Sequence, residues 1–170
     1  ILSEQQRLLL PFVQSLKKEF YLVGGTAIAL HIGHRQSIDF DLFKKTNIRR
    51  EKLAQNLRDH NLTFQLLFAN TESFHIIVKG VKITFFQFPF DIPAKTTFEE
   101  IRMPDLIQLA AMKAYALGRR AKWKDYVDLY FILRDHYPLE SILANTEKLF
   151  PGLFSPKLFR QQLCYFEDVD

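Results

Sequence analysis

The sequence predicts an α/β (α+β) fold, with a mixed sheet flanked by helices in its first half and a helical second half. Two patterns support this prediction. Short apolar runs with strand-like alternation lie between residues 20 and 88, and apolar positions at helical spacing dominate from residue 104 onward. We expect an α/β core over residues 1–95 and a helical region over residues 96–170 that packs on it as one compact unit.

The first elements are predicted from apolar spacing and from glycine positions. Residues 3–20 carry apolar side chains one helical turn apart, which predicts an amphipathic helix. Residues 20–23 form a short β-like run that ends at Gly24-Gly25. Residues 26–32 then read as a helix, because a glycine that favours a helix end follows them.

The remaining strands of the first half are predicted from alternation. Acidic and apolar side chains alternate over residues 37–43, which predicts a strand. Residues 44–60 are polar and helical in character. Strands are expected over residues 64–68, 73–79 and 81–88, and the last two form a hairpin around a glycine.

The second half is predicted to be all helical. Prolines interrupt regular structure after residue 88, and long apolar stretches with few strand signals follow. We expect helices over residues 105–117 and 124–134, with a weaker one near the end of the chain.

Composition limits the class of protein. Cys164 is the single cysteine, which excludes an internal disulfide and a cysteine-built zinc site and fits a cytoplasmic protein. The longest apolar stretch, residues 21–32, falls short of the ~20 residues that span a bilayer, so we expect no membrane partner. A net charge of +4 is mildly basic, which alone is weak support for an anionic partner.

Asp39 and Asp41 flank Phe40 on a predicted strand. Residues two apart on a strand project from the same face, so both carboxylates point one way. Two carboxylates this close repel unless a cation lies between them. Their hard oxygen atoms suit Mg²⁺, with triphosphate oxygens completing the ligand shell. The alternative is an edge strand that shows two acids to solvent.

Gly24-Gly25-Thr26 lie where a predicted strand turns into a helix. Glycines let the backbone approach a ligand closely, and free N–H groups at the start of a helix attract phosphate. Such a pair is by itself more often only a tight turn. Its position upstream of Asp39 and Asp41, with residues 26–38 between, strengthens the interpretation as a phosphate-binding turn.

This order of an apolar residue, Gly24-Gly25, a short helix and Asp39-Phe40-Asp41 resembles the signature of the DNA polymerase β-like nucleotidyltransferase superfamily. The run over residues 23–43, with His34-Arg35-x-Ser37 before the acids, resembles more narrowly the opening of the AbiEii/AbiGii family. That family comprises nucleotidyltransferase-like toxins of bacterial type IV toxin–antitoxin and abortive-infection systems. The resemblance resumes over residues 105–113 and 124–130.

The resemblance implies a nucleotidyltransferase fold and transfer of a nucleoside monophosphate from an NTP to a hydroxyl acceptor, tRNA or other RNA among the candidates. Gly24, Gly25 and Thr26 would bind the triphosphate, and Asp39 and Asp41 would bind Mg²⁺. A cognate antitoxin is the implied protein partner.

Lys113 stands near the middle of an apolar predicted helix, and Asp125 and Asp128 lie one turn apart on the next helix. A short connection makes the two helices antiparallel neighbours, which brings the lysine near the acids. One interpretation is a structural Lys–Asp pair that locks the helix hairpin. The resemblance implies instead that Lys113 contacts the triphosphate and that Asp125 orients the catalytic site, and both roles are compatible.

Arg35 also admits two roles, because a guanidinium before the acid strand either clamps a phosphate or neutralises the two aspartates when metal is absent. Basic residues flank the predicted site and would receive a nucleic-acid backbone, or form only a solvated surface. These residues are Lys44, Lys45, Arg49, Arg50, Arg119, Arg120, Lys122 and Lys124.

The pattern departs from the superfamily at the third carboxylate. The neighbouring strand over residues 81–88 offers Thr84 where many relatives place an acid. A neutral hydroxyl weakens binding of a second Mg²⁺ and removes a base for the attacking hydroxyl. Two hypotheses follow: a Mg²⁺-dependent nucleotidyltransferase, or a catalytically weak or inactive nucleotide-binding or regulatory module with the same fold.

Overall fold

A computed structural model describes residues 1–120, 122–167 and 169 of the chain. The chain divides into two compact units, residues 1–103 and 104–170. The division lies after residue 103, whereas the sequence placed the end of the α/β core at residue 95. The difference arises from a short hairpin over residues 96–103 that belongs to the first unit.

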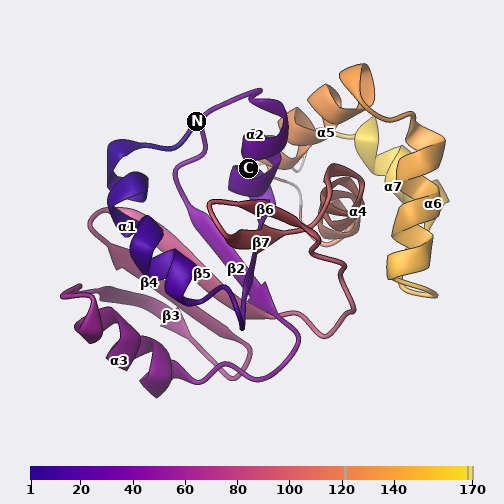
Figure 1. Cartoon of the computed structure of the whole chain (residues 1–170). Coiled ribbons are helices and arrows are strands. Elements are labelled where there is room, and N and C mark those ends of the chain that lie inside the picture. Colours follow the sequence, from indigo (N-terminus) through magenta and orange to yellow (C-terminus); the bar gives the residue numbers. More distant parts are fainter. Residues whose placement is uncertain (121, 168, 170) are drawn as a thin grey trace. The chain divides into compact units, whose positions relative to one another are not determined.

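The first unit combines helices with a sheet (Figure 1). Its elements are α1 (Glu4–Ser15), β1 (Tyr21–Val23), α2 (Gly24–Ile32), β2 (Phe40–Lys44), α3 (Arg50–Asp59), β3 (Gln65–Ala69), β4 (Ser73–Val78), β5 (Val81–Gln87), β6 (Thr96–Phe98) and β7 (Ile101–Met103). The main sheet has the strand order β1-β2-β5-β4-β3. Strands β2 and β5 run parallel and the other neighbours antiparallel, which confirms the predicted mixed sheet.

One face of this sheet is covered by α1 and α3. Phe40, Ile83 and Phe85 on that face are fully buried. The two helices are neighbours, because Ser15 Oγ of α1 lies 3.1 Å from Asn56 Oδ1 of α3. Burial of large apolar side chains contributes most of the favourable free energy of such a core, so this face fixes the register of the strands.

The other face carries Asp41, one of the predicted site residues. In β2 the buried residues alternate with half-buried ones, and Asp41 belongs to the half-buried set. Asp41 pairs in register with Thr84 of β5, and Thr84 pairs with His75 of β4. Paired residues on neighbouring strands project from the same face, so Asp41, Thr84 and His75 form one row across the sheet.

Two element boundaries differ from the prediction, and one hairpin was missed. The helix expected over residues 44–60 begins only at Arg50, because Lys44 belongs to β2. The strand expected from residue 37 begins at Phe40, since the segment before it makes side-chain contacts with α2 instead. The hairpin β6–β7 was not predicted. Its turn residues Glu99 and Glu100 both have positive φ without being glycine.

The second unit consists of the helices α4 (Leu106–Leu117), α5 (Trp123–Asp135), α6 (Leu139–Leu149) and α7 (Pro156–Leu163). The first two confirm the predicted helices closely, and the weak signal near the end resolves into α6 and α7. Helix α4 is buried over most of its length, and Tyr115 of α4 stacks on Phe150 with ring centroids 4.0 Å apart. None of the helices in the described part of the chain has the length and apolarity that crossing a bilayer requires.

Candidate nucleotide-binding site

The turn from β1 into α2 places its first glycine against an acid. Val23 pairs with Asp41 in the antiparallel β1–β2 ladder, so Gly24 follows directly beside that carboxylate. Gly24 has φ +71°, in the left-handed region that costs other residues ~1–2 kcal/mol. A Cβ at Gly24 would overlap the Oδ2 atom of Asp41. Glycine is therefore required here both for the backbone conformation and for the close approach of Asp41.

The second glycine lies against a cation. A Cβ at Gly25 would overlap the Nη2 atom of Arg35 and would lie 3.3 Å from Ser37 Oγ. Opposite charges therefore cover the two glycines, with the Asp41 carboxylate at Gly24 and the Arg35 guanidinium at Gly25. The sequence predicted that Arg35 either binds a phosphate or neutralises the two aspartates. Both roles fit this placement, because the guanidinium reaches the start of α2.

The start of α2 carries no side-chain cap. Val23 at the N-cap makes no capping hydrogen bond to the first-turn N–H groups of the helix. Uncapped N–H groups at a helix start attract phosphate oxygens, helped by the helix dipole. Gly24, Gly25 and Thr26, the predicted phosphate-binding residues, occupy this first turn.

Thr26 and Gln6 hold the segment that leads into the acid strand. The buried Thr26 hydroxyl donates to the backbone carbonyl of Asp39 and hydrogen-bonds with Ser37 Oγ at 2.9 Å. Gln6 Nε2 donates to the same carbonyl at 3.2 Å, and Gln6 is fully buried. Thr26 therefore positions Asp39 through its backbone. The sequence analysis missed Gln6, although Ser3-x-x-Gln6 has the spacing of a helix capping box, which the structure contains.

The donor set fits a Mg²⁺ ion that is shared with a nucleotide. Asp41 lies on β2 and Asp39 directly precedes it; both are half-buried and flank the fully buried Phe40. Mg²⁺ commonly takes one or two carboxylates and completes its octahedron with water and substrate phosphates. Within the described residues, no cluster of three or more His, Cys, Asp or Glu side chains forms an all-protein metal site. Two carboxylates beside an uncapped helix start thus suit a metal that arrives with a polyphosphate.

Thr84 occupies the position that the sequence analysis identified as lacking an acid. It stands beside Asp41 in the parallel β2–β5 register. His75 is the next residue in the same row, and it was not among the predicted site residues. Burial, with a smaller contribution from Lys82, lowers the pKa of His75. His75 is therefore a neutral imidazole at neutral pH, and its only sequence signal is its place in an alternating strand.

In the second unit, Lys113 is held between two acids. Lys113 Nζ lies 2.5 Å from Asp125 Oδ1 and 3.0 Å from Asp128 Oδ2, and all three side chains are almost completely buried. Arg120 Nε approaches the other oxygen of Asp125 at 3.7 Å. The predicted convergence of Lys113 with Asp125 and Asp128 is therefore present. A contact of Lys113 with triphosphate and an orienting role for Asp125 remain predictions.

The predicted basic flanks differ among themselves. Lys44 is only 5% exposed and bonds Glu19, so it is not a surface cation as the sequence suggested. Lys45, Arg49 and Arg50 are exposed. In the second unit, Arg119 lies over the Tyr115 ring at 3.5 Å. The remaining basic residues of that flank, Arg120, Lys122 and Lys124, are exposed.

A glycine turn beside an Asp-Phe-Asp segment that leads into a strand of a mixed sheet is typical of a nucleotidyltransferase-fold protein. The structure is similar to that of JHP933 from Helicobacter pylori, with a TM-score of 0.63 at 18% identity over 96% of this chain and 90% of that one. It is also similar to MenT4, a nucleotidyltransferase toxin from Mycobacterium tuberculosis H37Rv, with a TM-score of 0.62 at 12% identity over 98% and 74% of the two chains. At these identities the likeness establishes the fold.

The sequence comparisons establish the family. Residues 7–96 and 81–155 match the family described as nucleotidyl transferase AbiEii toxin, type IV TA system. An uncharacterized protein of Aquifex aeolicus (strain VF5) is 30% identical over 176 residues, which cover 99% of this chain and 84% of that protein. The chain belongs to the AbiEii nucleotidyl transferase toxin family, which supports nucleotidyl transfer as its general reaction.

Proposed function

We propose that this protein transfers a nucleoside monophosphate from an NTP to a hydroxyl acceptor, that the acceptor is an RNA such as tRNA, and that Mg²⁺ held by Asp39 and Asp41 is required. The observation that best supports this function is the contact of the Asp41 carboxylate with Gly24. It brings a metal-binding group and an uncapped helix start to one place, as a metal-bound polyphosphate needs.

The chain's own residues act by binding and orienting the nucleotide. N–H groups of Gly24, Gly25 and Thr26 would hold phosphate oxygens, and Arg35 would add a bidentate clamp from its position at Gly25. The acceptor oxygen then attacks the α-phosphorus, and the bond to the pyrophosphate leaving group breaks. Bound Mg²⁺ would supply charge neutralisation on the phosphoryl oxygens. Positioning and electrostatics contribute most of the rate enhancement in such reactions.

Lys113 and Asp125 enter this proposal from the family resemblance. Lys113 would neutralise charge on the triphosphate, and Asp125 would hold the ammonium group in place, as its 2.5 Å ion pair allows. The same pair also has a structural role within its own unit, so loss of activity in a Lys113 variant has to be judged against its stability.

The test is incubation of the protein with each of the four α-labelled NTPs, Mg²⁺ and total tRNA. We expect label in RNA with the wild type and its loss in Asp39→Asn and Asp41→Asn. Asp59→Asn, which changes an exposed acid at the end of α3, is the charge-matched control and should retain activity. Incorporation that persists in both site variants would refute the roles assigned to these acids.

A second candidate function is a nucleotide-binding or toxin-regulating module with little or no turnover. Thr84 favours it, because the register places this neutral side chain beside Asp41 where a third acid would stand. Mg²⁺-dependent NTP binding with no label transfer to RNA over hours, from any of the four NTPs, would support this function over the first.

We also propose a cognate antitoxin as protein partner, on the basis of family membership. Its test is co-expression of the chain with the product of an adjacent small open reading frame, with growth as the measurement. Growth arrest by the chain alone that the neighbour relieves would support the proposal, and unaltered growth in both cases would oppose it.

A further inference from the structure

A hollow of about 450 Å³ opens in the first unit at the end of the β1–β2 pair away from Gly24. Its wall includes Tyr21 of β1, Lys44 at the end of β2, Lys45, the segment over residues 90–94 and Arg102 of β7. The antiparallel register separates it from the nucleotide site, since Tyr21 pairs with Phe43 while Val23 pairs with Asp41. It is therefore distinct from the glycine turn.

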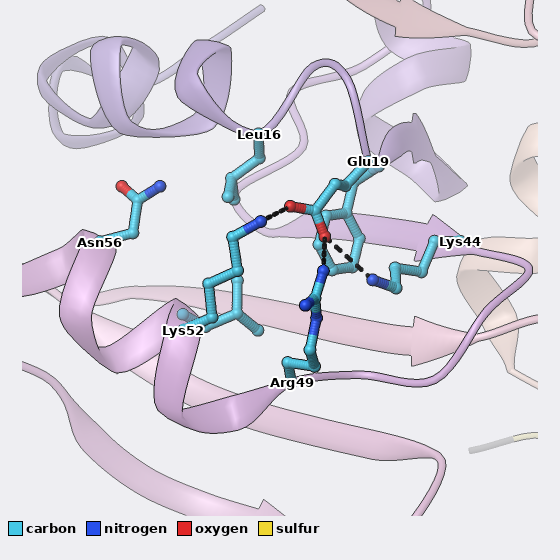
Figure 2. Close-up of a pocket in the computed structure, with 8 residues that line it drawn as sticks. Leu16, Glu19, Lys44, Arg49, Lys52 and Asn56 are labelled. Atoms are coloured by element: carbon cyan, nitrogen blue, oxygen red, sulfur yellow. Dashed lines mark hydrogen bonds and ion pairs between the residues drawn. The ribbon is translucent and has the colours of Figure 1, made fainter.

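Cations outnumber anions around this hollow. Its charged lining residues are Glu19, Lys44, Lys45, Asp91 and Arg102. Glu19 bonds Lys44 at 3.1 Å, and Lys52 and Arg49 contact the same carboxylate from a neighbouring pocket (Figure 2). Lys45 pairs with Asp91 at 2.6 Å.

The excess positive charge is partly shielded from water. Lys44 has a side chain that is only 6% exposed, and Arg102 adds a further cation to the wall that forms no ion pair with a described carboxylate. Charge that is removed from water attracts a counter-ion more strongly than a solvated surface charge does. An anionic ligand would balance this excess.

Tyr21 and Arg102 each hold one hydrogen-bond donor group at the hollow that has no acceptor among the described residues. The Tyr21 hydroxyl is buried without a hydrogen-bond partner among the described residues, and Tyr21 is 7% exposed overall. Burial raises the pKa of Tyr21, so the group is a neutral donor. Arg102 Nε donates to the Lys17 carbonyl at 2.8 Å and Nη2 to the Lys18 carbonyl at 3.4 Å. These bonds orient the guanidinium and leave Nη1 without a hydrogen bond to any described residue.

A buried hydroxyl without a partner is destabilising by ~1–3 kcal/mol, and such groups are rare in native proteins. The Tyr21 hydroxyl lies at the same hollow as the Arg102 guanidinium, whose orientation is fixed by hydrogen bonds. This combination indicates a binding site in which a ligand supplies the missing acceptor. Because the Tyr21 oxygen is shielded from solvent in the free protein, a small side-chain shift has to accompany binding.

We propose that this hollow binds a phosphate group of a nucleotide or an RNA strand, with Arg102 and Lys45 as charged donors and Tyr21 as the neutral donor. A guanidinium with fixed orientation matches phosphate geometry. Asp91 does not oppose this, since its side chain is 87% exposed and its ion pair with Lys45 exchanges at little cost. Ile92 and Pro93 supply an apolar wall for the sugar or base that accompanies the phosphate.

The test measures binding by the full chain in EDTA, without Mg²⁺, with two probes: ATP and a 5′-phosphorylated single-stranded RNA dodecamer. We expect Lys45→Ala and Tyr21→Phe each to weaken binding about five- to tenfold, as loss of one charge-assisted or buried hydrogen bond predicts. Tyr21→Phe removes one oxygen that has no partner in the free protein, so its folding should be unimpaired.

One control separates this site from the rest of the molecule. Lys157→Ala removes an exposed lysine of the second unit and should bind the probes as the wild type does. Binding of RNA alone identifies a backbone phosphate as the ligand, and binding of both probes identifies a nucleotide phosphate. No binding of either probe, or equal binding by Tyr21→Phe and Lys45→Ala and the wild type, overturns the proposal whether or not the protein transfers nucleotides.

Discussion

Lys113→Met tests whether the buried ion cluster of the second unit is a structural element. The substitution keeps most of the side-chain volume and removes the ammonium group that lies 2.5 Å from Asp125 and 3.0 Å from Asp128. Two carboxylates that are 2% and 0% exposed then remain without their main counter-charge. Removing one partner of a buried ion pair costs about 3–5 kcal/mol, and Arg120 at 3.7 Å compensates only in part.

We therefore expect the free energy of unfolding of Lys113→Met to fall by about 3 kcal/mol or more at pH 7. The measurement is urea unfolding followed by circular dichroism and by fluorescence of Trp123, the single tryptophan, which begins α5 beside this cluster. Adding Asp128→Asn should restore part of the loss, because it removes one uncompensated charge. Lys124→Met, at an exposed position of the same helix, should change stability by less than about 0.5 kcal/mol. A loss below about 1 kcal/mol in Lys113→Met would refute the structural role.

Three further predictions concern the first unit. Gly24→Ala should lower stability by more than the backbone cost of about 1–2 kcal/mol, because its Cβ also overlaps Asp41 Oδ2, and it should abolish Mg²⁺-dependent NTP binding in calorimetry. Gly80→Ala, with φ +79° and no atom within 4 Å of its added Cβ, should show the backbone cost alone. Thr84→Asp places a third carboxylate beside Asp41, so it should tighten Mg²⁺ binding several-fold and lower metal-free stability by about 0.2–1 kcal/mol. The measurement is the rise in melting temperature on adding Mg²⁺, with Thr84→Asn as the control. A rise in Thr84→Asp no larger than in the control would oppose this prediction. Hydrogen bonds from Lys52 and then Lys44 lower the pKa of Glu19. The free energy that Glu19 contributes to folding is therefore fully present above its unfolded pKa of 4.5 and is lost as pH falls through its lower folded pKa. In acid unfolding, the stability of Glu19→Gln should depend less on pH over this range than that of the wild type.

The fold class and the approach of Asp41 to the glycine turn followed from sequence because local rules and global structure agree there. Gly24-Gly25 ends one strand and opens one helix, and alternation in the next strand assigns Asp41 to the half-buried set of side chains. The neutral position at Thr84 was also predicted, because the superfamily resemblance indicated the strand over residues 81–88 as the neighbour of the acids, and Thr84 pairs with Asp41. These features depend on residues that are close in sequence, or on the pairing of β2 with β5.

Features set by distant contacts were not predictable. Lys44 looked like a surface cation, but β2 continues far enough to bury it against Phe20 and Glu19. The β6–β7 hairpin has strands too short for alternation to reveal them. The Tyr21 hollow arises where β1, β7 and the segment over residues 90–94 meet, and no spacing along the chain indicates such a meeting.

We propose above all that the glycine turn and the aspartate pair together bind one metal-bound polyphosphate. Titration calorimetry of each NTP into the wild type, Asp41→Asn and the control Asp59→Asn, with Mg²⁺ and then with EDTA, tests it most directly. We predict binding at the turn that requires Mg²⁺ in the wild type and the control, and that weakens at least about tenfold in Asp41→Asn. NTP binding of equal strength in all three proteins, with or without Mg²⁺, would contradict the claim.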